Sequence, residues 1–134
     1  MSQENVELVR HATEDFLRRD LDALVNAYDP EVHWSDLQHA PDAPPDVHGI
    51  EAVRRVWEDW LDSFPDLRAD IAEYIDCGDT VVCAIHWHGS GRESGVHIDQ
   101  HTFDCFEVRG GVIRRVTLGY SRREDALEAA TAER

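Results

Sequence analysis

The period of the hydrophobic pattern changes once along this chain, close to Leu67, and this change constrains the fold most strongly. Before it, apolar residues recur every three or four positions, as in Val53, Trp57 and Trp60, which is typical of amphipathic helices. After it, apolar and polar residues alternate over long stretches, which is typical of strands. Helices followed by a run of strands predict an α+β fold with an antiparallel sheet.

We expect helices over 2–17, 21–28, 50–64 and 121–130, and strands over 32–36, 67–75, 80–89, 96–108 and 112–120. Asp20 is placed to cap the second helix, and Pro30 is expected to end it. Segment 37–49 holds three of the five prolines and reads as a loop. Sheets of such long strands coil, so helices on the concave side would leave a tapered, cone-shaped space.

Charge and cysteine usage narrow the classes of partner. The 134 residues include 28 acidic and 13 basic ones, every basic one arginine, for a net charge of −15. Such a negative field repels phosphate and anionic lipid, so we expect no nucleic-acid and no membrane partner.

The polar N-terminal residues predict neither a secretory signal nor a transit peptide. Cys77, Cys83 and Cys105 form no CxxC pair, which favours reduced cysteines in strands and a cytoplasmic setting.

Three segments resemble the nuclear transport factor 2-like superfamily, and within it the SnoaL-like polyketide cyclases and the ketosteroid isomerases. They are RRDLDALVNAYDPEVHWSD (18–36), HGIEAVRRVWEDW (48–60) and DCFEVRGGVIRRV (104–116). The resemblance implies one domain over residues 1–134, a cystatin-like, cone-shaped α+β barrel whose curved antiparallel sheet carries helices on its concave face. The superfamily holds isomerases, cyclases and dehydratases as well as modules without chemistry, so the fold alone does not select a function.

Two aspartates are the first candidates for catalysis. The resemblance places Asp36 at the isomerases' general base, and Asp104 at their protonated aspartate and at the cyclases' acid/base aspartate. The alternation of the strand supports Asp104, which shares a face with the apolar Phe106 and Val108. Burial there would raise the pKa of the carboxyl and suit a proton donor. The alternatives are a structural Asp104 bonded to backbone or arginine, and an Asp36 that is a solvated cap.

The sequence departs from two patterns of the superfamily. Ala12 stands where the isomerases place a tyrosine on the first helix, so one oxyanion donor is absent there. Tyr120, at the end of the last strand, is a candidate to supply a phenol instead. Leu118 stands where the epoxide hydrolases place an aspartate, which argues against that reaction.

Histidines form the second signal. His86 and His88 lie two apart on one strand and face the same side, so both are candidates for a general base or a substrate-orienting donor. The alternative places them on a polar outer sheet face that could form a subunit contact, with Trp87 in the pocket instead. His101 has the opposite alternation to Asp104. The other sheet and loop histidines, which we expect at the surface, are His33, His39, His48 and His97.

The segment HWHGSGRE, with Glu93 after the two histidines, resembles the first cupin metal motif. Glu93 falls in a glycine-flanked loop, later strands carry no second histidine motif, and the helical start does not fit a cupin. We therefore expect no metal and no cofactor.

Aromatic residues complete the expected site. The candidate substrate-binding residues are Trp34, Trp57, Trp60, Gln100, Phe106 and Tyr120. They would wall a pocket for a small apolar or aromatic molecule, or simply pack the core. We expect a small-molecule enzyme that moves protons without a cofactor, as an isomerase, cyclase or dehydratase. The alternative is a non-catalytic ligand-binding or dimerisation module, and a homodimer is expected because the sheet leaves a face and an edge to cover.

Overall fold

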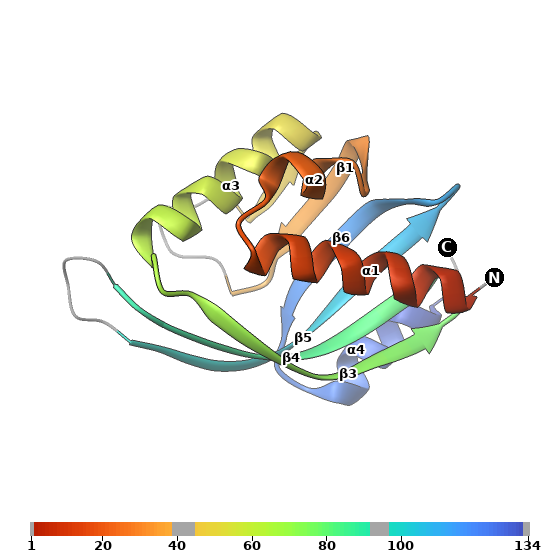
Figure 1. Ribbon diagram of the computed structural model, residues 1–134. Coiled ribbons are helices and arrows are strands. Elements are labelled where there is room, and N and C mark those ends of the chain that lie inside the picture. Colours follow the sequence, from red (N-terminus) through yellow and green to blue (C-terminus); the bar gives the residue numbers. More distant parts are fainter. Residues whose placement is uncertain (1, 39–44, 92–96, 133–134) are drawn as a thin grey trace.

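The computed structural model describes residues 2–38, 45–91 and 97–132. Its helices are α1 (Ser2–Leu17), α2 (Leu21–Val25), α3 (Ile50–Ser63) and α4 (Arg123–Thr131). Its strands are β1 (Tyr28–Asp36), β2 (Asp46–His48), β3 (Arg68–Cys77), β4 (Thr80–Ser90), β5 (His97–Arg109) and β6 (Val112–Tyr120). The order of elements confirms the predicted α+β class (Figure 1).

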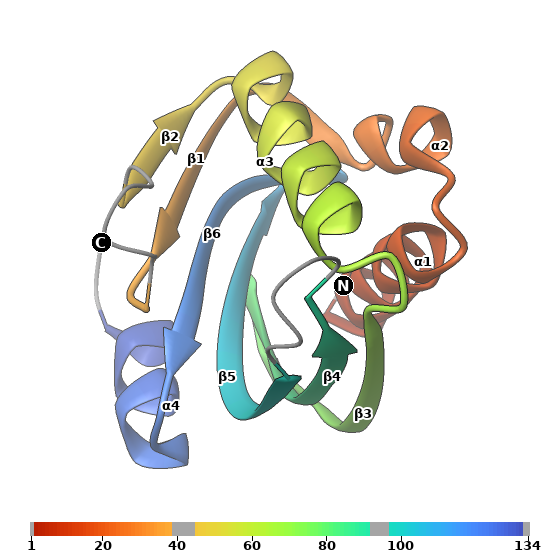
Figure 2. The ribbon, with the colours of Figure 1, turned by 90° about the vertical axis from the view of Figure 1, so that its left-hand side faces the viewer.

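The six strands form one curved sheet in the order β2-β1-β6-β5-β4-β3. Helices α1, α2 and α3 lie on one side of this sheet and α4 on the other (Figures 1 and 2). The sheet is open and not closed on itself. One expectation was wrong in detail: β1 pairs with β6 in parallel. No hairpin joins β1 to β6, since α3 and four strands intervene, so turn geometry does not force an antiparallel pair.

The start of β1 also differs from the prediction. Tyr28 and Pro30 belong to the strand and not to the second helix, which ends at Val25. Proline lacks an N–H for the ladder, and the pairing with β6 shifts register between Tyr28 and His33. Strand β2 falls within the segment expected to be a loop, while residues 39–44 and 92–96 of the two expected loops lie outside the described residues.

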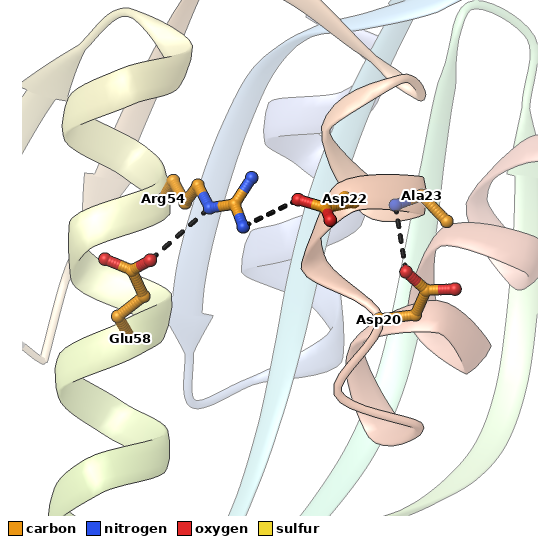
Figure 3. Close-up of polar contacts among 5 residues, drawn as sticks. All are labelled: Asp20, Asp22, Ala23, Arg54 and Glu58. Carbon is orange, nitrogen blue, oxygen red and sulfur yellow. Dashed lines mark hydrogen bonds and ion pairs between the residues drawn. The ribbon is translucent and has the colours of Figure 1, made fainter.

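Polar contacts fix α2 against its neighbours. Asp20 caps the helix as predicted, because its carboxylate accepts the N–H of Ala23 at 3.1 Å (Figure 3). Arg54 of α3 donates to Asp22 at 2.8 Å and lies 3.4 Å from Glu58 one turn further along α3. These exposed pairs contribute little energy, but they orient α2 toward α3.

Each side of the sheet has its own apolar cluster. On the concave side, the larger cluster joins α1, α2 and α3 to the strands and includes Val9, Val53 and Trp57. On the outer side, α4 packs Ala126 and Ala130 against Val82 and Cys105. The cysteines are free, as predicted. Among the described residues, no helix combines the length and apolar character that a bilayer crossing requires.

Candidate functional site

An inner chamber of about 50 Å³ lies between the concave face of the sheet and the helices. Aromatic rings from five elements line most of it: Phe16, Tyr28, Trp34, Trp57, Trp60, Trp87 and Phe106. Several of these rings pack edge to face, as Trp34 does against Trp57 with ring centroids 6.0 Å apart and an angle of 77° between the planes. The chamber has room for a few water-sized groups but for no ring system.

A larger outer cavity of about 310 Å³ adjoins this chamber. The two spaces share four lining residues: Trp60, Trp87, Asp104 and Leu118. The outer cavity adds apolar side chains (Phe64, Leu67 and Ile98) and polar groups (Asp36, Gln38, Gln100, Thr102 and Gly119). Its volume falls within the range of small-molecule sites, and its mixture of apolar walls and few polar groups is typical of them.

Asp104 of β5 lies where the two spaces meet, and its side chain is almost completely buried, with 1% of the residue exposed. One carboxylate oxygen accepts the backbone N–H of Gly119 at 2.8 Å. Burial raises the pKa of this carboxyl to about 7, although the Gly119 hydrogen bond acts to lower it. The nearby charge of Asp36 adds to the rise. Asp104 is therefore a carboxyl group that can hold or release a proton near neutral pH.

The polar rim of the outer cavity is built around Gly119. The backbone of Gly119 has a φ of +93°, and a Cβ there would lie 3.3 Å from Gln38 Cγ and 3.5 Å from Asp36 Oδ1. This Asp36 oxygen accepts the N–H of Gln38 at 2.9 Å, and the Gln38 side chain donates to the Gly119 carbonyl at 2.7 Å. Gln100 in turn donates to the Gln38 side-chain oxygen. Asp36 and Asp104 are thus held at one end of the cavity.

Thr102 brings a further polar atom to the outer cavity. Thr102 is 5% exposed, and its hydroxyl oxygen is buried without a hydrogen-bond partner among the described residues. The hydroxyl lies near enough to Asp104 to act against the rise in its pKa, although the geometry falls short of a hydrogen bond. A buried, unpaired hydroxyl costs free energy, so a bound polar group would be favoured there.

Tyr28 is a potential functional residue that the sequence reasoning missed. It lines the inner chamber, and burial, followed by the charges of Cys83 and Asp104, raises the pKa of its phenol. A phenol held protonated in this way is a hydrogen-bond donor. The spacing within 21–28 had suggested a helix. The available signal was Asp29, next to Tyr28, because a residue directly before proline favours an extended backbone and Asp29 precedes Pro30.

Three of the predicted site residues lie on the wrong side of the sheet. His86 and His88 face the outer side, where they contact Asp99 at 2.5 Å and Asp70 at 3.0 Å, so their assignment to the pocket was wrong. Tyr120 packs in the outer cluster beneath α4 and cannot supply the phenol. In β4 both faces carry apolar residues, so alternation separates the faces without showing which one lines the pocket.

The other predicted residues do lie at the two cavities. Trp34, Trp57 and Phe106 line the inner chamber, Gln100 lines the outer one, and Trp60 lines both. Trp87 faces the pocket, as the alternative interpretation of the histidines proposed. The surface histidines are exposed as predicted where the structure describes them: His33, His48 and His97. His39 and Glu93 lie outside the described residues.

Comparison with known proteins identifies the class. The sequence model of the SnoaL-like domain matches residues 9–116, so the chain belongs to the SnoaL-like family. This confirms the resemblance on which the fold was predicted. No curated protein matches the sequence.

Solved structures confirm the nuclear transport factor 2-like fold. Bal32a, from a soil-derived mobile gene cassette, has a TM-score of 0.79 at 18% identity, covering 87% of this chain and 88% of its own. An NTF2-like protein of Burkholderia xenovorans LB400 has a TM-score of 0.76 at 18% identity, with 98% of both chains covered. TerC, co-crystallised with polyporic acid, has a TM-score of 0.76 at 16% identity, covering 96% of this chain and 99% of its own. At these identities the likeness extends to the fold alone.

Proposed function

We propose that this protein catalyses cofactor-independent proton transfer on a small, apolar substrate that bears a carbonyl or hydroxyl group. The observation that carries the proposal is the position of Asp104: a carboxyl with a pKa of about 7, buried at the junction of an aromatic chamber and a ligand-sized cavity. The same residue would serve poorly as a mere structural group, because its burial opposes its charge.

Two carboxyl groups would divide the acid and base roles. Asp36 lines the same cavity and is less buried, so it would act as the base that removes a carbon-bound proton. Neutral Asp104 would donate a hydrogen bond or its proton to the oxygen on which negative charge develops. The Tyr28 phenol, on the inner side, is a second donor of the kind that Ala12 does not provide. The return of the proton to a different atom would complete an isomerisation, and ring closure or loss of water would use the same pair.

The two cavities suggest how a substrate would lie. The inner chamber is too small for a ring, so the apolar body would occupy the outer cavity between Trp60, Trp87 and Ile98. Its oxygen would then point to Asp104 and the unpaired hydroxyl of Thr102. TerC shares the fold and was co-crystallised with polyporic acid, which agrees with an organic acid or carbonyl compound as a ligand class.

The proposal can be tested without knowing the natural substrate, because abstraction of a carbon-bound proton exchanges it with solvent. We expect the protein, incubated in D₂O with a panel of aromatic ketones and cyclic enones, to incorporate deuterium next to the carbonyl of at least one compound. Mass spectrometry measures the rate. Asp104→Asn and Asp36→Asn should each lower it by at least about tenfold, and Tyr28→Phe by a similar factor, through loss of the acid, the base or a donor.

The control is Asp59→Asn, which makes the same chemical change at an exposed residue of α3 and should leave the rate unchanged. Exchange that persists at the full rate in Asp104→Asn would contradict the assignment of the acid. Compounds that bind and raise the melting temperature without any exchange would instead support the alternative, a ligand-binding module.

A further inference from the structure

The outer face of the sheet carries a second cluster of chemically active side chains, which the proposed function does not use. Its members are His86 and His88 of β4, His101 and Asp99 of β5, and Asp70 of β3. We call these five residues the outer-face cluster. The cluster lies on the opposite side of the sheet from Asp104 and from both cavities.

Strand register brings the cluster together. His86 pairs directly with His101 of β5 and with Asp70 of β3, and His88 pairs with Asp99. Direct cross-strand partners on one face have side chains close enough to touch. The His86 ring therefore lies stacked on His101, with centroids 3.9 Å apart, and 3.8 Å from the His88 ring.

The donor atoms converge as well as the rings. In each of two triads, Asp70–His86–His88 and His86–Asp99–His101, one ligand atom per residue lies within 4.8 Å of the others. An ion held at about 2.1 Å by imidazole and carboxylate needs tetrahedral ligand atoms about 3.4 Å apart, so small side-chain rotations would suffice. His88 Nε2 and Asp70 Oδ2 are already 3.0 Å apart.

We propose that the outer-face cluster binds one divalent first-row transition-metal ion, such as Zn²⁺, through His86, a neighbouring histidine and an aspartate. Imidazole with carboxylate is the ligand set that Zn²⁺, Ni²⁺ and Cu²⁺ accept. The net charge of −15 raises the local concentration of cations at the surface. The side chains of His86 and His88 are 27–28% exposed, so an ion can reach them from solvent and can keep a water molecule as a further ligand.

The structure changes the meaning of the histidine motif. The sequence set His86 and His88 beside Glu93, whereas the fold supplies the further ligands from the two adjacent strands. Because each triad draws its ligands from two strands, β3 with β4 or β4 with β5, a bound ion would link two adjacent strands of the sheet. It would act on stability or assembly rather than on chemistry at Asp104.

The test is calorimetric titration of the metal-free full chain with ZnCl₂, near neutral pH, with the bound ion counted by elemental analysis after gel filtration. We expect one ion per chain. His86→Ala should weaken binding by at least about tenfold, because His86 belongs to both triads and even lost outer-shell partners cost that much. Comparison of His88→Ala with His101→Ala identifies the second histidine, since the two substitutions should differ in their effect.

His33→Ala is the matched control, because it breaks a second stacked histidine pair of the described residues, His33 on His48 with ring centroids 4.5 Å apart. The His33→Ala substitution should leave Zn²⁺ binding unchanged. Circular dichroism verifies that each variant is folded. The proposal is overturned if the wild-type chain retains no ion, if His86→Ala binds as tightly as the wild type, or if His33→Ala abolishes binding while His86→Ala does not.

Discussion

At the scale of single residues, Asp104 combines a chemical capacity with a cost in stability. Its carboxyl is buried among aromatic and aliphatic side chains, and one of its oxygens accepts a hydrogen bond from the Gly119 backbone. The folded-state pKa of about 7 lies above the value of 3.8 for an exposed aspartate. Between these two values the folded chain binds a proton that the unfolded chain releases, so raising the pH through this window destabilises the fold.

This linkage gives a prediction for Asp104→Asn. Asparagine keeps the shape and can still accept the Gly119 N–H, but it carries no charge at any pH. The variant should therefore gain about 2–3 kcal/mol of unfolding free energy relative to wild type between about pH 5 and about pH 8. Urea unfolding at both pH values measures the difference, with Asp59→Asn as the control that shows no such change. A difference in unfolding free energy between variant and wild type that stays constant with pH would show that Asp104 ionises normally.

Alternation of apolar and polar residues along a strand shows which residues share a face, but it does not always show which face lines the pocket. The family resemblance pointed to Asp104, and alternation supported it because Phe106 and Val108, two and four positions later, are apolar and share its face. His86 and His88 were misplaced because Val82, on their own face, is fully buried by α4, just as Val81 is buried on the pocket side. A strand covered on both faces gives two apolar patterns, and local sequence does not rank them.

At the scale of elements, Trp57 fixes α3 to the sheet. It is 2% exposed, and its ring packs against Tyr28 at 5.2 Å and Trp34 at 6.0 Å, both on β1. Trp60, one turn further, is half-buried and borders both cavities. The two tryptophans therefore differ in role although their spacing is that of one helix face.

We expect Trp57→Ala to lower the free energy of unfolding by about 3–5 kcal/mol, because it removes a buried indole and leaves a cavity between α3 and β1. Trp60→Ala should cost less, since its ring already borders open space, and it should join the inner chamber to the outer cavity. Denaturant unfolding of both variants measures the difference. An equal or larger loss in Trp60→Ala would show that the α3 contact does not depend on Trp57.

Elements were predicted well where periodicity was long and poorly where it was short. The 14 residues of α3 and the 13 of β5 repeat their patterns several times. The five residues of α2 complete little more than one turn, so Tyr28 fitted a helical spacing by coincidence. The three residues of β2 are too few for alternation to be visible, and their pairing with β1 depends on tertiary contacts.

At the scale of the whole molecule, net charge and incomplete coverage of the sheet have opposite effects on the association of two copies. Strands β2 and β3 are the two edges of the sheet, and of the helices only α4 covers its outer side. Exposed edges and faces favour association with a second copy. Each copy, however, carries a net charge of −15, and this repulsion extends farther in dilute buffer than in physiological salt.

The homodimer expected from the sequence stays a prediction, and its salt dependence makes it specific. Gel filtration with light scattering should give a mass near twice the 15.3 kDa of the chain at physiological ionic strength. The fraction of dimer should fall as salt is removed, because the screening length grows from about 8 Å to about 30 Å at 0.01 M and the two acidic surfaces then repel each other. A chelator in every buffer separates this effect from that of any bound metal ion. A mass of one chain at every salt concentration would contradict the prediction, and a dimer that strengthens as salt is removed would show that attraction between opposite charges, and not burial of apolar surface, holds the two copies together.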